Sequence, residues 1–86
     1  MALLEFYGQE CPHCVEMAVL VERLEKEEKL TIEKYEVWHN EQHALRMQEV
    51  DKGNCGGVPY FYNTETKKFL CGESDYDALK AWAKGA

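Results

Sequence analysis

The chain has 86 residues, 45% hydrophobic and 12% aromatic, a composition typical of one folded domain over 1–86 and not of a disordered segment. Sixteen acidic against ten basic residues give a net charge of −6, which argues against nucleic acids and anionic membranes as main partners. No apolar run approaches the roughly 20 residues that span a bilayer, and the start MALLEFY lacks the regions of a signal peptide. We therefore expect a cytoplasmic protein, where four cysteines serve catalysis or metal binding more often than crosslinking.

The first half of the chain has the pattern of a strand followed by a long helix. Residues 2–7 are apolar apart from Glu5, which is typical of a buried strand. From Pro12 to about Lys29 the apolar residues recur at helical spacing. The expected buried face of this helix comprises Cys14, Met17, Ala18, Val21 and Leu24. The expected ion pairs on its exposed face are Glu22–Lys26 and Glu25–Lys29.

The second half predicts shorter elements. Residues 31–38 and 58–62 are rich in β-branched and aromatic residues, which favours strands. Between them, Asn40 can cap a helix that runs to about Asp51 and ends at Gly53. The remaining elements are a hairpin turn over 63–66, a strand over 67–71, and a helix opened by Ser74 with Asp77 as its capping-box partner.

The resulting order is β-α-β-α-β-β-α, an α/β arrangement. The first two strands are joined by a helix and should be parallel, with a right-handed crossover. The hairpin makes the last two strands antiparallel. The sequence therefore predicts a mixed four-stranded sheet with helices on its faces.

The segment Cys11-Pro12-His13-Cys14 is the strongest candidate site. Haem attachment needs a histidine directly after the second cysteine, and Val15 stands there. Structural zinc needs a second pair of ligands at short spacing, whereas Cys55 and Cys71 are sixteen residues apart. A metal or cluster site on the two motif cysteines stays open as an alternative.

Redox chemistry explains more of this segment. Cys11 at the helix cap would face unsatisfied N–H groups, which stabilise the reactive thiolate. Pro12 suits the first helical position, because its missing N–H would be unpaired there. Cys14 lies one turn on, so we expect Cys11 to be the exposed nucleophile and Cys14 the buried resolving thiol. A protonated His13 beside Cys11 would stabilise the thiolate further and make the disulfide a better oxidant.

Three stretches carry a resemblance to the thioredoxin superfamily. LLEFYGQECPHC resembles its active-site strand and turn, and the CPHC tetrapeptide resembles that of DsbA-type disulfide oxidants. GGVP at 56–59 is similar to the segment of the superfamily's cis-proline, and LCGESDYDAL at 70–79 resembles the last strand and helix start of glutaredoxins. The resemblance covers nearly the whole chain and implies the minimal glutaredoxin-like version of the thioredoxin fold.

The resemblance also implies roles for single residues. Pro59 would be the cis-proline, and Val58 would offer its backbone to an extended substrate. Glu5 would be a buried carboxylate that accepts the proton of Cys14, and burial would raise its pKa. Asp75 would hold the amino end of glutathione, with plain helix capping as the alternative.

The chain departs from the family patterns near the motif. Glu10 stands where thioredoxins usually carry a tryptophan, and an acid there should oppose thiolate formation. Glutaredoxins usually have a basic residue shortly before the pair and a threonine before the Val-Pro, where this chain has Gln9 and Gly57. Glutathione use is therefore possible but not indicated.

Cys55 and Cys71 have no role that the sequence alone decides. A hairpin centred on 63–66 would place Cys71 roughly opposite Val58, close to Cys55. A second disulfide, a shuttle pair with the motif cysteines and two idle thiols are all compatible with this placement. Idle thiols are the default expectation, because free cysteine is a common buried small residue.

Together these observations predict a thiol-disulfide oxidoreductase that works without metal or organic cofactor and as a monomer. Its docking surface would comprise Val58, Pro59, Tyr7 and also Tyr60. Its expected partners are protein or small-molecule disulfides and dithiols, with glutathione as an option, and a recycling reductase. The alternatives are a glutathione-dependent glutaredoxin-like enzyme and, from a different class, a metal- or cluster-binding module.

Overall fold

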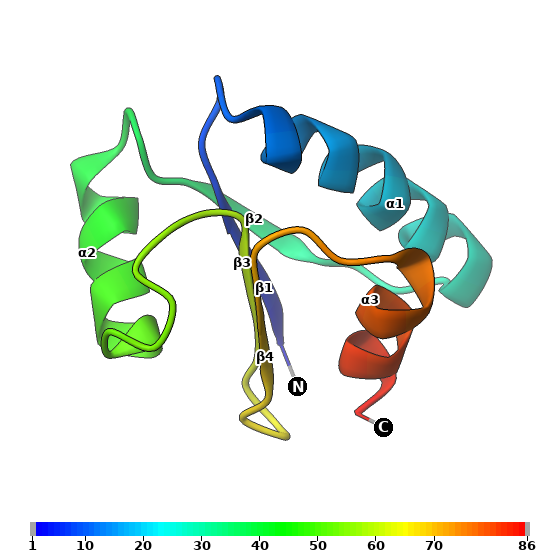
Figure 1. Ribbon diagram of the computed structural model, residues 1–86. Coiled ribbons are helices and arrows are strands. Elements are labelled where there is room, and N and C mark those ends of the chain that lie inside the picture. Colours follow the sequence, from blue (N-terminus) through cyan, green and yellow to red (C-terminus); the bar gives the residue numbers. More distant parts are fainter. Residues whose placement is uncertain (1, 86) are drawn as a thin grey trace.

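The computed structural model describes residues 2–85 and has the predicted order of elements (Figure 1). The elements are β1 (Leu3–Tyr7), α1 (Pro12–Glu28), β2 (Glu33–Glu36), α2 (Glu41–Asp51), β3 (Tyr60–Asn63), β4 (Phe69–Cys71) and α3 (Tyr76–Lys84). The sheet order is β2-β1-β3-β4, with β1 and β2 parallel and the other neighbouring pairs antiparallel. The predicted mixed four-stranded sheet is therefore confirmed. Within residues 2–85, no helix has the length and apolar character needed to cross a membrane.

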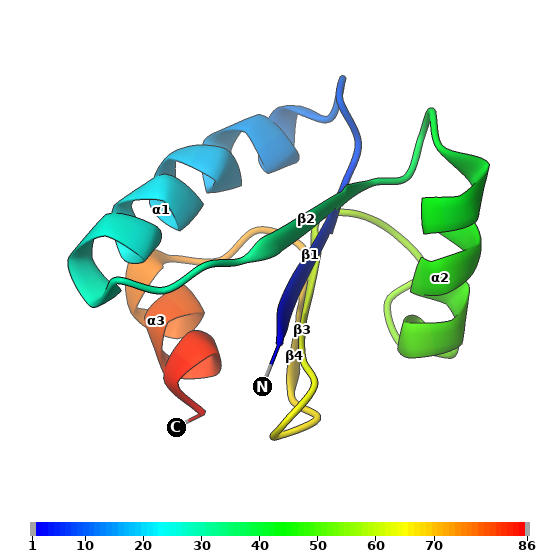
Figure 2. The same cartoon turned by 180° about the vertical axis from the view of Figure 1, so that it is seen from behind.

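The two faces of the sheet are covered by different helices. Helices α1 and α3 lie on one face and α2 on the other (Figures 1 and 2). Alternate side chains of β1 pack on opposite faces of the sheet. Leu3 packs in the cluster with α1 and α3, whereas Leu4 and Phe6 pack in the cluster with α2. One five-residue strand thus contributes to two cores, which explains why β1 is apolar on nearly every position.

The strands differ from the predicted ones at their ends. The strand expected over 31–38 is confined to Glu33–Glu36, and the N–H of Ile32 donates to the Glu25 carboxylate at 2.9 Å. The strand expected over 58–62 begins only at Tyr60, because Pro59 before it has no N–H to donate. The strand expected over 67–71 is reduced to Phe69–Cys71.

Helix α1 ends where Lys29 adopts a left-handed conformation, with φ of 53°. The predicted Glu22–Lys26 pair is present at 3.1 Å. The predicted Glu25–Lys29 pair is wrong, because Glu25 instead bonds Lys34 at 3.0 Å. Four of the five residues expected on the buried face are buried, whereas Ala18 is exposed.

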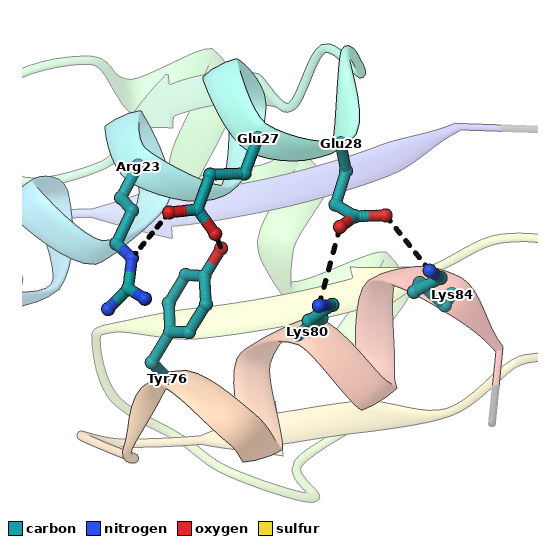
Figure 3. A network of polar contacts seen from close by, with 6 residues as sticks. All are labelled: Arg23, Glu27, Glu28, Tyr76, Lys80 and Lys84. Atoms are coloured by element: carbon teal, nitrogen blue, oxygen red, sulfur yellow. Dashed lines mark hydrogen bonds and ion pairs between the residues drawn. The ribbon is translucent and has the colours of Figure 1, made fainter.

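Helix α3 is capped by Asp75 and not by Ser74, since the Asp75 carboxylate accepts the N–H of Ala78 at 2.8 Å. A network of charged and aromatic side chains fastens α3 to α1 (Figure 3). Its contacts are Arg23–Glu27 at 2.9 Å, Tyr76–Glu27 at 2.8 Å, Lys80–Glu28 at 3.4 Å and Lys84–Glu28 at 2.9 Å. These contacts lie at the exposed side of the helix pair, so they contribute more to the alignment of the helices than to stability.

Candidate functional site

The two motif cysteines lie where β1 passes into α1. Cys11 is the N-cap residue of the helix, and its sulfur accepts the N–H of Cys14 at 3.2 Å. The N–H of Cys11 donates to Gly8 O at 3.1 Å, which closes the turn before the helix. Both cysteines are free thiols. The structure thus places the Cys11 sulfur at the amino end of the helix and Pro12 at the first helical position, as predicted.

The prediction that Cys11 is exposed is wrong. Cys11 is 4% exposed and Cys14 is 3% exposed, so the two thiols are buried to the same degree. The reason is the capping geometry, because the side chain of Cys11 turns inward to the backbone of the first helical turn. A substrate disulfide must therefore approach closely to reach either sulfur.

The environment of Cys14 strongly favours its neutral form. Burial and then the hydrogen bond with Cys11 raise the pKa of the Cys14 thiol to about 12. The charge of Glu5 acts in the same direction and is the smallest of these causes. Cys14 therefore stays protonated at neutral pH as long as the site is in its dithiol form.

Glu5 is buried in the middle of β1, on the face covered by α1 and α3. Burial raises the pKa of its carboxyl from 4.5 to about 7, and the charge of Lys34, its register partner on β2, opposes part of this rise. The expected burial is thus observed. A carboxyl with this pKa can take up or release a proton near neutral pH.

His13 contacts an acid in the loop that follows β4. Its side chain is 68% exposed, and its Nδ1 lies 3.2 Å from a carboxylate oxygen of Glu73. Interaction with the neighbouring Glu73 raises the pKa of Glu16, and interaction with Glu16 and His13 lowers the pKa of Glu73. The contact of His13 is therefore with an acid sixty residues away, which the sequence reasoning did not anticipate.

The segment before β3 has the geometry that the resemblance implied. The peptide bond between Val58 and Pro59 is cis. Pro59 is buried and Val58 half-buried, and the Pro59 carbonyl accepts the N–H of Gly72 at 2.7 Å. Because Phe6 and Tyr60 are register partners, this segment lies beside the end of β1 that leads into the motif.

Three further predicted residues have clear positions. Tyr7 is half-buried at the end of β1, where its carbonyl accepts the N–H of Val37 at 2.8 Å. Asp75 uses its carboxylate to cap α3. Tyr60 is fully buried, so its inclusion in the docking surface is wrong; the alternation along β3 points it into the core beneath α2. Burial raises the pKa of its phenol to about 12.

Trp38 is the site residue that sequence reasoning missed. Its indole lies against Gly8, in the space that a Cβ at Gly8 would occupy, and the residue is still 51% exposed. Gly8 begins the turn that leads to Cys11, so a large exposed aromatic side chain flanks the motif. The signal in the sequence was a glycine three residues before Cys11, together with a tryptophan at the end of the strand expected over 31–38.

The loop after β2 and the turn before the motif lie at the same end of the sheet (Figures 1 and 2), and side-chain contacts join them. Glu36 accepts the N–H of Gln9 at 2.9 Å and the N–H of His39 at 2.7 Å. The His39 ring lies 2.7 Å from the Glu10 carboxylate, and this hydrogen bond raises the pKa of His39. The acid before Cys11 is thus partnered by an imidazole.

A groove of about 480 Å³ lies between α2 and the segment that leads to the cis-proline. Trp38 and Met47 contribute apolar surface to it, and Gly57 and Val58 line it from the opposite side. The groove is therefore continuous with the Val58 edge expected to bind substrate.

Cys55 and Cys71 form a disulfide, with their Cα atoms 5.5 Å apart. The default expectation of idle thiols is wrong. The expected register was also wrong, because Cys71 is the partner of Tyr60 and not of Val58. Cys55 reaches β4 only because the segment 52–58 folds back toward the sheet, which a hairpin register alone does not reveal.

Two groups of side chains have the composition of metal ligands within residues 2–85. They are Glu10, Glu36 and His39, and His13, Glu16 and Glu73. In each group one carboxylate already bonds the histidine ring, and the residues lie at the surface or half-buried. Neither group, within that range, includes a sulfur of the motif.

Comparison with known proteins defines the fold. The structure is similar to the crystal structure of a glutaredoxin from Archaeoglobus fulgidus, with a TM-score of 0.72 and 21% sequence identity over 99% of this chain and 89% of that chain. The fold is therefore the glutaredoxin-like version of the thioredoxin fold. No family model and no curated protein matches the sequence.

Proposed function

We propose that this protein is a thiol-disulfide oxidoreductase that exchanges protein disulfides through Cys11 and Cys14. The observation that carries the proposal is the helix-capping geometry, in which the Cys11 sulfur accepts the N–H of Cys14 at 3.2 Å. A backbone donor and the positive end of a 17-residue helix both stabilise a thiolate at this atom.

In the first step the Cys11 thiolate attacks one sulfur of a substrate disulfide. A Cys11–substrate disulfide forms, the substrate S–S bond breaks, and the leaving thiolate takes a proton from water. The N–H of Cys14, which faced the thiolate, then faces a neutral sulfur.

In the second step Cys14 attacks the Cys11 sulfur, the Cys11–substrate S–S bond breaks, and the second substrate sulfur leaves as a thiolate that takes a proton from water. Forming the mixed disulfide removes the charge of Cys11, which is one of the causes that raise the pKa of Cys14. Glu5 receives the Cys14 proton, since its own pKa is raised to about 7. The products are a Cys11–Cys14 disulfide and a substrate dithiol, and the reverse sequence oxidises a dithiol.

An extended peptide would dock along Val58 and Pro59. The half-buried position of Val58 and the place of Pro59 beside the end of β1 favour a backbone pairing there. Tyr7 and the indole of Trp38 would contact the flanking residues of the peptide, and the groove behind Val58 would receive an apolar side chain.

Glutathione-dependent activity is the second candidate, favoured by the similarity to an archaeal glutaredoxin. Two features weigh against it. Glutathione is an anion, and the motif is flanked by Glu10, Glu16 and Glu73. Asp75 would have to bind an amino group with a carboxylate that already caps α3. We therefore rank peptide and protein disulfides above glutathione as substrates.

The test is catalysis of disulfide reduction by the full chain, with dithiothreitol as the electron donor and a peptide containing one disulfide as the substrate. We expect turnover by the wild type and its loss in Cys11→Ser. Thr66→Ser, in the hairpin turn at the far end of the sheet from the motif, serves as the matched control and should retain full activity. Equal rates for Cys11→Ser and the wild type, or one zinc bound per reduced chain, would reject the proposal, and the second result would favour the metal-binding alternative.

A further inference from the structure

The segment 52–58, which leads to the docking residue Val58, has no regular secondary structure. It contains three glycines, and Gly53 and Gly56 have φ of +79° and +74°, in the left-handed region. Glycine-rich chain of this kind is costly to order, so a fixed docking edge needs anchors from outside the segment. The structure provides two, and both hold Cys55.

The first anchor is Asp51, the last residue of α2. The carboxyl end of a helix disfavours an anion, yet this carboxylate is buried there. Its two oxygens accept the N–H of Cys55 at 2.7 Å and the N–H of Gly56 at 2.8 Å. The Asp51 carboxylate therefore stabilises the segment and not α2, because a cation and not an anion would stabilise the carboxyl end of the helix.

The second anchor is the Cys55–Cys71 disulfide. Cys71 is the register partner of Tyr60, and the next residue, Gly72, donates its N–H to Pro59 O at 2.7 Å. The crosslink thus ties the segment to the strand that directly supports the cis-proline. Cys55 lies three residues before Val58. Its backbone is bonded to Asp51 at the end of α2, and its side chain is bonded to Cys71 of β4.

We propose that Cys55 is the positioning residue of the docking edge, and that the Cys55–Cys71 pair is a second redox site that sets affinity for polypeptide substrates. The inference rests on the proposed function and extends it. With the disulfide formed, the segment that ends at Val58 is tied to β4 through Cys55, and Val58 is held ready to pair with an extended peptide. With the pair reduced, only Asp51 remains, and the peptide must order the glycine-rich segment as it binds.

The exchange itself begins at Cys71, because Cys71 is exposed and Cys55 is half-buried. The thiolate of an external dithiol attacks the Cys71 sulfur, the Cys55–Cys71 bond breaks, and the Cys55 thiolate leaves and takes a proton. The second thiol of the dithiol then displaces Cys71 from the mixed disulfide. Two electrons and two protons pass to the pair, and the dithiol becomes a disulfide.

The first experiment compares wild type with a Cys55→Ser/Cys71→Ser variant on two substrates, a peptide disulfide and the small disulfide of 2-mercaptoethanol. We expect the KM for the peptide to rise about fivefold or more, with kcat for the peptide and kcat/KM for the small disulfide changed less than twofold. Asp51→Asn, which loses one of the two acceptors, should change the same KM in the same direction. Asp77→Asn, at an exposed position of α3, is the matched control and should change nothing.

An unchanged peptide KM in the double serine variant, or an equal loss on both substrates, would overturn the inference while the proposed function stands. Inactivity of the wild type on both substrates would reject the proposed function and the inference with it.

A second measurement covers the case in which the double variant does not fold. In Cys11→Ser/Cys14→Ser, alkylation and mass spectrometry should show Cys55–Cys71 reduced reversibly by dithiothreitol in the folded protein, and Trp38 fluorescence should show weaker peptide binding after reduction. The inference would be contradicted if the Cys55–Cys71 pair were reduced only in denaturant, or if the peptide bound equally well to the oxidised and the reduced protein.

Discussion

The indole of Trp38 occupies the space in which a side chain at Gly8 would begin. These two residues belong to different loops, one before the motif and one after β2, and their contact holds both loops together at the end of the sheet that carries Cys11. The glycine is required here for close approach of the ring, since its backbone conformation is not left-handed.

Gly8→Ala should therefore destabilise the protein through overlap with the indole. We expect a loss of about 1–3 kcal/mol in the free energy of unfolding, as for other insertions into packed contacts. Trp38→Ala in the same chain should remove most of this loss, because it vacates the space. Urea unfolding of the single and double variants measures the coupling, and additive effects would show that the contact is not the cause.

Glu5→Gln should change how stability depends on pH. Between pH 4.5 and about 7 the native state holds the Glu5 proton while the unfolded chain has released it, so the free energy of unfolding falls as pH rises through this window. At about 1.4 kcal/mol per pH unit the fall amounts to about 3 kcal/mol. Glu5→Gln lacks this pH-dependent contribution. The difference between its free energy of unfolding and that of the wild type should therefore shift in favour of the variant between pH 5 and pH 8.

Urea unfolding of both reduced proteins at the two pH values provides the measurement. Parallel pH dependence in Glu5→Gln and the wild type would show that the carboxyl ionises as an ordinary glutamate. The variant should also accumulate the mixed disulfide during turnover, because the Cys14 proton has lost its acceptor.

His39 should titrate above its ordinary value of 6.5 because of its hydrogen bond with Glu10. The contribution of this pair to stability is fully present below that value and is lost as pH rises through the higher native pKa. In Glu10→Gln the pKa of His39 should fall back toward the ordinary value. Proton NMR of the imidazole resonances measures the titration curve of His39 in the wild type and in Glu10→Gln. Identical curves in the two proteins would contradict the His39–Glu10 pairing.

The acids around the motif should select among peptide substrates. Glu10 precedes Cys11, and Glu16 on α1 and Glu73 after β4 lie close to His13 of the motif, so a cationic peptide is attracted and an anionic one repelled. A disulfide peptide flanked by lysines should show a several-fold higher kcat/KM than the same peptide flanked by glutamates. The difference should shrink in high salt, and a preference for the glutamate peptide would refute this account of specificity.

Local sequence signals predicted much of the fold and part of the site. The periodicity of α1, the Asn40 cap and the apolar run of β1 depend on near neighbours, and all three are present in the structure. The same is true of Cys11 at the helix cap, since Pro12 directly after it marks the first helical position. Glu5 could be identified because a single acid interrupts an otherwise apolar strand.

Contacts between distant segments could not be predicted in this way. His13 meets Glu73 across sixty residues, and its expected neighbour was the sulfur beside it in sequence. The burial of Cys11 depends on how its side chain turns onto the helix, which composition does not specify. The Cys55–Cys71 pairing depends on the path of the segment 52–58, and the register inferred from the hairpin turn was two residues off.

The most direct test of the account is to trap the mixed disulfide. Cys14→Ser removes the resolving thiol, so a peptide disulfide should leave one covalent adduct per chain, located on Cys11 by peptide mapping and mass spectrometry. Cys11→Ser under the same conditions should yield no adduct on Cys14, because burial keeps that thiol protonated. An adduct on Cys14, or no adduct in Cys14→Ser, would contradict the assignment of Cys11 as the nucleophile.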